Sequence, residues 1–233
     1  MHYDYTGLAQ DVRLFKALQR QRVGLRERIR AVEQGRANGH TAWHQDIHDG
    51  LEGIEKGIEK LLASKHPLWT DWLCHVRGVG EMTLAQLLGE ISTVKGHNGH
   101  PGIGAFDTVS SLWKFSGLTP GAKLVKGETA SYNTRLKTIC SEFVGGGIIK
   151  ANGEYRRIYD EKKAYYTANR PDWTPAHRHF AARRKMVKTF LSHFWEKWRV
   201  LEGYPVRLPY VIETLGHTHL DRWEDFVTAP AHA

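Results

Sequence analysis

The sequence predicts an all-α protein, and three observations support this fold class. Apolar residues recur at helical spacing in several segments, and the strictly alternating runs typical of strands are scarce. Breaks containing glycine or proline separate these segments. We expect an antiparallel helical hairpin or coiled coil over residues 1–66, a helix-hairpin-helix domain over 67–145 and a helical extension over 146–233.

Two amphipathic segments predict the N-terminal hairpin. Apolar residues lie at helical spacing over residues 8–34 and again over 47–62, with a Gly/Asn/His stretch at 35–40 between them. The two helices are therefore expected to pack antiparallel. Their narrow apolar stripe also suits a coiled coil or a dimer arm. The glycines at 50, 53 and 57 either weaken the second helix, by about 1 kcal/mol each, or permit close helix–helix approach.

Shorter elements follow the boundary at Pro67. The expected helices cover residues 68–76, 82–91, 108–116, 132–143, 154–167 and 177–202. The segments at 96–104 and 121–131 are rich in glycine or polar residues and are expected to be loops. The glycines at 145–147 are expected to interrupt the helix before them, and Ser131 is expected to cap that helix at its start.

The composition favours an anionic partner. The formal net charge is +8 and the pI about 9.5, an excess that suits DNA, RNA or an acidic membrane face, or simply an ordinary basic protein. No signal peptide and no apolar run long enough to cross a bilayer occurs in the sequence, so we expect a cytoplasmic chain that does not enter a membrane. Cys74 and Cys140 are too few for a disulfide framework and are expected to be buried free thiols.

A Gly-x-Gly pair, Gly78 and Gly80, directly precedes a strong helix pattern in the segment VRGVGEMTLAQLLGEI. Two glycines let a turn bring bare backbone close to another surface, and the free N–H groups of the next helix can hold a phosphate. Arg77 would add charge beside this site, whereas Glu81 would compete for the helix end. The alternative is a simple corner between helices in which the glycines serve packing. The sequence Gly102-Ile103-Gly104 repeats the pattern in a weaker form.

Basic residues near helix ends supply the other candidate contacts. Arg135 and Lys137 lie at a helix start, where positive charge is unfavourable unless an anion is bound, and Lys126 lies in the loop before them. Arg183 and Arg184 belong to a basic run in the last long helix. The alternative for each cluster is a solvated charged face.

Tyrosines alternate with basic residues over 154–167, a pattern that suits stacking of unpaired bases but also fits a core stripe covered by cations. The closest histidine pairs are His97/His100, His177/His179 and His217/His219. None has the cysteine or acidic companions of a closed zinc site, so no metal and no cofactor is predicted.

Three motifs in order, GVGEMTLAQLLGEIS, DTVSSLWKFSGLTP and YNTRLKTIC, together resemble the C-terminal domain of the Piv-invertase-like DEDD insertion-sequence transposases. The residues that carry the resemblance are Gly78, Gly80, Ala85, Glu90, Ile91, Phe115, Gly117, Leu118, Pro120, Asn133, Arg135 and Leu136. The resemblance covers residues 72–143 and implies a scaffold that handles DNA.

Two features depart from that family. Its N-terminal ribonuclease-H-like domain, with four acidic metal ligands, is not expected here because the residues before His66 read as two helices. Its serine nucleophile follows the Gly-Leu-x-Pro turn as Ser-Gly, whereas this chain has Lys126 before Gly127 and only Ser131 nearby.

The sequence therefore predicts a nucleic-acid-binding protein that grips DNA, with a guide-type RNA as a further partner left open, mainly through backbone phosphates. The expected contacts are Arg77, Gly78, Gly80, Lys126, Arg135, Lys137, Arg183 and Arg184. Two alternatives stay open. One is a divergent transposase or recombinase with Ser131 as nucleophile and a partner chain that supplies the metal-binding domain. The other is a non-catalytic module whose N-terminal helices form a homo-oligomer.

Overall fold

The computed structural model describes residues 7–62, 66–207 and 221–227. Its elements are helical, and within these residues the β pairing is limited to one bridge between Lys95 and Pro101. This confirms the all-α fold class. Within the same ranges, no helix combines the length and the apolar character needed to cross a membrane.

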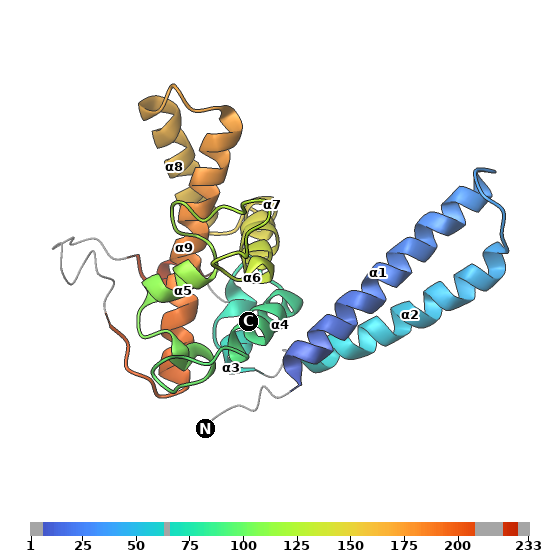
Figure 1. Cartoon of the computed structure of the whole chain (residues 1–233), viewed down its shortest axis with the longest axis horizontal. Helices are drawn as coiled ribbons and strands as arrows, with labels where there is room; N and C mark the ends of the chain where they lie inside the picture. Colours follow the sequence, from blue (N-terminus) through green and yellow to red (C-terminus); the bar gives the residue numbers. More distant parts are fainter. Residues whose placement is uncertain (1–6, 63–65, 208–220, 228–233) are drawn as a thin grey trace, which may run out of the picture.

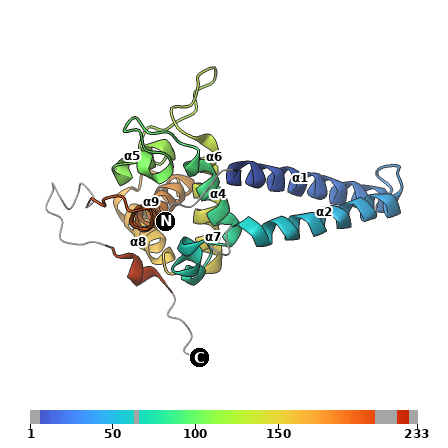
Figure 2. The same ribbon diagram turned by 90° about the horizontal axis from the view of Figure 1, so that it is seen from below.

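Helices α1 (Leu8–Glu33) and α2 (Thr41–Leu62) lie side by side and project from the body of the protein as an arm (Figures 1 and 2). A salt bridge of 3.0 Å between Arg22 Nε and Glu55 Oε1 joins them. A methyl group at Gly50, Gly53 or Gly57 would meet no atom within 4 Å. These glycines therefore lie on open surface, and the idea that they permit close helix–helix approach is wrong.

The body is built from shorter helices around one long helix. Its elements are α3 (Pro67–Thr70), η1 (Leu73–His75), α4 (Glu81–Ser92), η2 (Gly102–Ala105), α5 (Val109–Phe115), α6 (Thr134–Thr138), the π-helical η3 (Ile139–Gly145), α7 (Gly146–Ala151), α8 (Arg156–Asn169), α9 (Pro175–Leu201) and η4 (Trp223–Phe226). Helix α9 runs through the body (Figure 1), and Phe190, Phe194 and Trp198 on it are fully buried. The base of the arm packs on α4, where a Cβ at Gly89 would lie 3.2 Å from the Cα of Ala9.

Several expected boundaries are wrong. The glycines at 145–147 do not interrupt the helix, because α6 continues through the π-helical η3 into α7. Asn133, and not Ser131, is the N-cap of α6, since its side chain accepts a hydrogen bond of 2.9 Å from the N–H of Leu136. The expected helix over 68–76 is broken at Trp72, whose φ of −150° is not helical.

The two cysteines differ in exposure. Cys74 is exposed, so the expectation that it is buried is wrong, whereas Cys140 is buried as expected. Burial raises the pKa of the Cys140 thiol.

The segment Gly102-Ile103-Gly104 is enclosed by its own chain. All three residues are buried, and a Cβ at Gly104 would lie 2.5 Å from the ring of Tyr204. The buried guanidinium of Arg199 on α9 donates hydrogen bonds to the carbonyl oxygens of Ile103 (3.3 Å) and Phe106 (2.9 Å). The second Gly-x-Gly therefore packs against α9 and does not present its backbone to solvent.

Candidate nucleic-acid interface

A tight turn follows α5 and packs on the start of α6. Gly117 has φ +64°, and a Cβ there would lie 2.6 Å from the ring of Tyr132, so only glycine fits. The backbone N–H of Asn133 donates to the carbonyl oxygen of Phe115 at 2.8 Å. Lys137 Nζ donates to the carbonyl oxygen of Ala122 at 3.0 Å and to the hydroxyl of Tyr132 at 3.2 Å. The turn is thus held in place over α6.

Gly145 in η3 allows α9 to approach the same region. A Cβ at Gly145 would lie 3.0 Å from Arg183 Cγ and 3.0 Å from Val187 Cγ2. Between the turn, the helix formed by α6 and η3, and the first half of α9 lies a cleft of about 650 Å³. Its lining residues are Gly117, Leu118, Thr119, Pro120, Gly121, Ala122, Lys123, Lys137, Thr138, Ser141, Glu142, His177, Phe180, Arg183, Arg184 and Val187. We call it the basic cleft.

Positive charge dominates the basic cleft. Lys123 comes from the turn, Lys137 from α6, and Arg183 and Arg184 from α9, whereas Glu142 is the acidic residue of the lining. Arg183 Nη2 donates to Glu142 Oε1 at 2.9 Å, and the Arg183 side chain is 13% exposed against 59% for Glu142. Guanidinium and ammonium groups that converge from three segments suit a ligand with several anionic oxygens, such as a phosphate chain.

The positive surface continues along α9 beyond the cleft. Lys188 lies one turn after Arg184, and its Nζ is 3.9 Å from the ring centroid of Trp113. Burial, together with the positive charges of Lys185 and Arg184, lowers the pKa of Lys188 to about 8. Basic groups are therefore close enough on this face of α9 to oppose one another's charge, which a bound anion would relieve.

Three of the eight expected contact residues, Lys137, Arg183 and Arg184, come together in the basic cleft. The Gly-x-Gly corner lies elsewhere. Gly78 has φ +89°, and a Cβ there would lie 2.6 Å from the backbone of Gly147 and Ile148, so this glycine allows the corner to pack on α7. Gly80 is exposed, with no atom within 4 Å of its ideal Cβ, and Arg77 is exposed beside it.

The remaining candidates do not line the cleft. Arg135 is exposed and lies 4.0 Å from Glu90 Oε1, and the amide of Asn133 donates to Glu90 Oε2 at 3.1 Å. These contacts tie α6 to α4. Lys126 and Ser131 are exposed on the loop before α6. The serine that does line the cleft is Ser141.

Sequence reasoning missed half of the cleft. Lys123, Ser141, His177 and Phe180 line it but were not among the expected contacts. The Gly-Leu-Thr-Pro turn was the available signal, because a tight turn after a short helix often carries function. The helix that this turn faces is set by the long-range packing of α9 and could not be read from local spacing.

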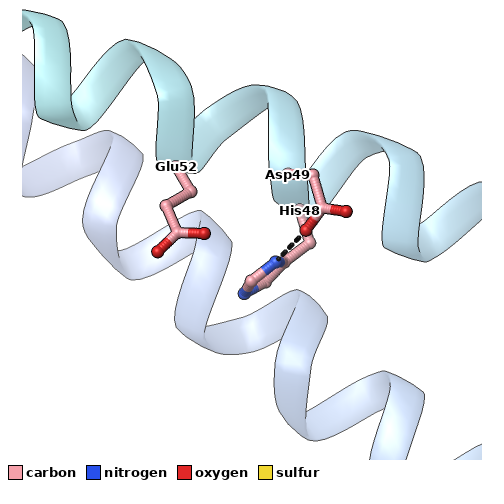
Figure 3. Close-up of side chains that lie close together, drawn as sticks. All are labelled: His48, Asp49 and Glu52. Carbon is pink, nitrogen blue, oxygen red and sulfur yellow. Dashed lines mark hydrogen bonds and ion pairs between the residues drawn. The ribbon is translucent and has the colours of Figure 1, made fainter.

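The expected absence of a metal site rested on histidine spacing. His177 and His179 have separate partners, since His177 stacks on Trp173 and His179 Nδ1 lies 2.7 Å from the Tyr159 hydroxyl. The pair His217/His219 lies outside the described residues. Among the described residues, three ligand-type side chains of α2 come close together, His48, Asp49 and Glu52 (Figure 3). His48 Nδ1 pairs with Asp49 at 3.0 Å and Glu52 pairs with Lys56 at 3.3 Å, so we assign this group to the charged surface of the arm.

Comparison of the chain with protein families, with curated proteins and with solved structures found no match. The resemblance to insertion-sequence transposases thus stays a prediction from the motifs. The segments that carry it do contact one another, because α6 is bonded to Glu90 of α4 and to Phe115 at the turn after α5. Their order in the sequence corresponds to one packed unit.

Proposed function

We propose that this protein binds nucleic acid by its backbone phosphates in the basic cleft. The observation that carries the proposal is the convergence of Lys123, Lys137, Arg183 and Arg184 on one cleft of about 650 Å³. Guanidinium groups can donate two hydrogen bonds to one phosphate, and the lysines add point charges beside them. The resemblance to transposases supports DNA as the partner, with a guide-type RNA as the second arm of the test.

Binding through phosphates predicts weak sequence preference and strong salt dependence. The experiment is fluorescence anisotropy with labelled duplexes of two unrelated sequences, titrated with the full chain at several salt concentrations. We expect similar affinities for both sequences and a slope of log K against log salt of about −3 to −4, as release of counterions from three or four phosphates requires. Absent binding, or binding that ignores salt, would contradict the proposal.

Replacement of Glu142 by glutamine is expected to tighten binding about 3- to 10-fold. The change removes the acidic group from the cleft lining and frees Arg183 from its salt bridge. Glu33→Gln, at an exposed position near the far end of α1, changes the net charge equally and serves as the control. Weaker binding by E142Q, or equal tightening by E33Q in the same anisotropy assay, would show that the cleft is not where phosphates lie.

Strand chemistry is not part of this proposal. A serine nucleophile would have to reach the phosphates, and Ser131 lies outside the lining of the basic cleft. The divergent transposase or recombinase would therefore need another hydroxyl or a different partner surface.

We further propose that the arm is a dimer contact with a second copy of this chain. Large apolar side chains are exposed on both of its helices, Leu14 and Val23 on α1, and Trp43 and Ile54 on α2. Helix α1 carries more basic than acidic residues and α2 the reverse, so α1 of one copy complements α2 of another. Light scattering is expected to give the mass of a dimer for the full chain and of a monomer for the double variant Leu14→Glu/Val23→Glu. A monomeric wild-type chain at tens of micromolar contradicts this contact.

A further inference from the structure

A set of aromatic rings lies where α8 meets α9 and continues into the basic cleft. We call this set the aromatic ledge, formed by Tyr165, Tyr166, Trp173, His177 and Phe180. Figure 1 shows the α8–α9 connection at the tip of the body, away from the arm. Tyr165 is 55% and Phe180 50% exposed, a large exposed area for aromatic side chains. His177 and Phe180 also line the basic cleft, so the ledge and the cleft form one continuous surface.

The rings of the ledge are ordered before any ligand binds. Trp173 and His177 lie face to face, with centroids 3.9 Å apart and planes 4° apart, and Tyr166 lies 5.3 Å from Trp173. The guanidinium of Arg178 holds the connection by donating to the carbonyl oxygens of Arg170 (3.2 Å) and Pro171 (2.9 Å). Thr174 caps α9 by accepting from the N–H of His177. Little conformational entropy is therefore lost when a flat ligand stacks here.

Cations alternate with the exposed rings. The guanidinium carbon of Arg183 lies 5.0 Å from the Phe180 centroid, and that of Arg170 lies 5.7 Å from the Trp173 centroid. Interleaved rings and basic groups are the usual arrangement for binding single strands, where bases stack on the rings and phosphates lie beside the cations.

The other tyrosines of α8 and its N-cap have a different role. Tyr155 and Tyr159 are buried, with hydroxyls 2.6 Å from His193 Nδ1 and 2.7 Å from His179 Nδ1. Their polar ends are bonded within the fold, and they belong to the core. The Tyr/basic pattern of the sequence thus divides, with its first half structural and its second half, Tyr165 and Tyr166, on the ledge.

We infer that the aromatic ledge stacks unpaired bases of a nucleic-acid strand whose phosphates lie in the basic cleft. This inference rests on the proposed function and narrows its substrate to a strand with unpaired bases. Bases inside a duplex have both faces covered by their neighbours, so only unpaired or extruded bases can use the rings. Stacking on aromatic side chains tolerates any base, which agrees with a phosphate grip that reads no sequence.

The test compares labelled probes of one length by anisotropy with the full chain. The probes are single-stranded DNA, single-stranded RNA, a duplex, and a DNA strand whose central nucleotides are abasic and therefore keep phosphates but lack bases. We expect the intact single strands to bind about 10-fold more tightly than the abasic strand. Phe180→Ala and Tyr165→Ala should each weaken single-strand binding about 5- to 10-fold and leave abasic and duplex binding unchanged.

Val200→Ala, which truncates an exposed apolar side chain at the other end of α9, is the control and should change nothing. Equal affinity for intact and abasic strands, or equal losses on every probe in F180A and Y165A, overturns the ledge while leaving the phosphate grip standing. No binding to any probe overturns the proposed function and the ledge together. A loss confined to RNA or to DNA supports the ledge and identifies the strand.

Discussion

Gly78→Ala is expected to destabilise the fold by about 3–5 kcal/mol or to prevent folding. Its φ of +89° is a conformation that a residue with a Cβ rarely adopts. The added methyl carbon would also lie 2.6 Å from backbone atoms of Gly147 and Ile148. Backbone on α7 cannot move aside as a flexible side chain can, so the two helices would have to separate. Urea unfolding followed by circular dichroism measures the loss.

Gly80→Ala is the matched control for this substitution. Gly80 has φ −96° and no atom within 4 Å of an ideal Cβ, and it is the N-cap of α4. The expected loss is at most about 1 kcal/mol, which is the preference of an N-cap for glycine over alanine. Equal losses for both variants would show that the corner does not pack on α7 as described.

The double variant Arg183→Gln/Arg184→Gln is expected to bind nucleic acid about 100-fold more weakly at low salt. It removes two of the four basic groups of the basic cleft, and hydrogen bonds to charged groups contribute about 1.5–3 kcal/mol each. Glutamine keeps most of the aliphatic stem that packs beside Gly145. The Glu142 carboxylate left behind is largely exposed, so we expect the fold to stay intact in a thermal melt.

A second double variant, Arg13→Gln/Arg26→Gln, separates local contact from overall charge. Both residues are exposed on α1, and their loss changes the net charge by the same amount. We expect less than a 3-fold change in affinity, because charges beyond about 10 Å are screened at ordinary ionic strength. Equal weakening by the two double variants would mean that total charge, and not the cleft, governs binding.

The long amphipathic helices could be predicted from the sequence because their apolar periodicity reports the buried face directly. The ranges expected for α1, α4 and α9 differ from the observed bounds by at most a few residues. The glycines at 145–147 show where such reasoning fails. Glycine lowers helix propensity, but here it is retained because Arg183 and Val187 pack on Gly145 and the Gly78 corner packs on Gly147. Tertiary contacts decide the outcome, and single-segment patterns do not contain them.

The candidate site was predictable in residue type but not in direction. Arg77, Lys126 and Arg135 carry the same charge as Arg183 and Arg184 and lie in similar local patterns, yet only the two arginines of α9 line the cleft. The difference arises from how α9 packs on η3, which depends on contacts between residues far apart in the chain. The Gly-x-Gly corner was misleading for a related reason, since a glycine that allows close approach can meet the protein's own backbone as well as a ligand.

The salt dependence of binding tests the central claim, that the basic cleft holds phosphates, most directly. Anisotropy titrations of one labelled strand across a range of salt concentrations give the slope of log K for the wild-type chain and for both double variants. The account predicts that Arg183→Gln/Arg184→Gln makes this slope shallower by about 2, one for each lost phosphate contact, while Arg13→Gln/Arg26→Gln leaves it unchanged. An unchanged slope in the cleft variant would contradict it.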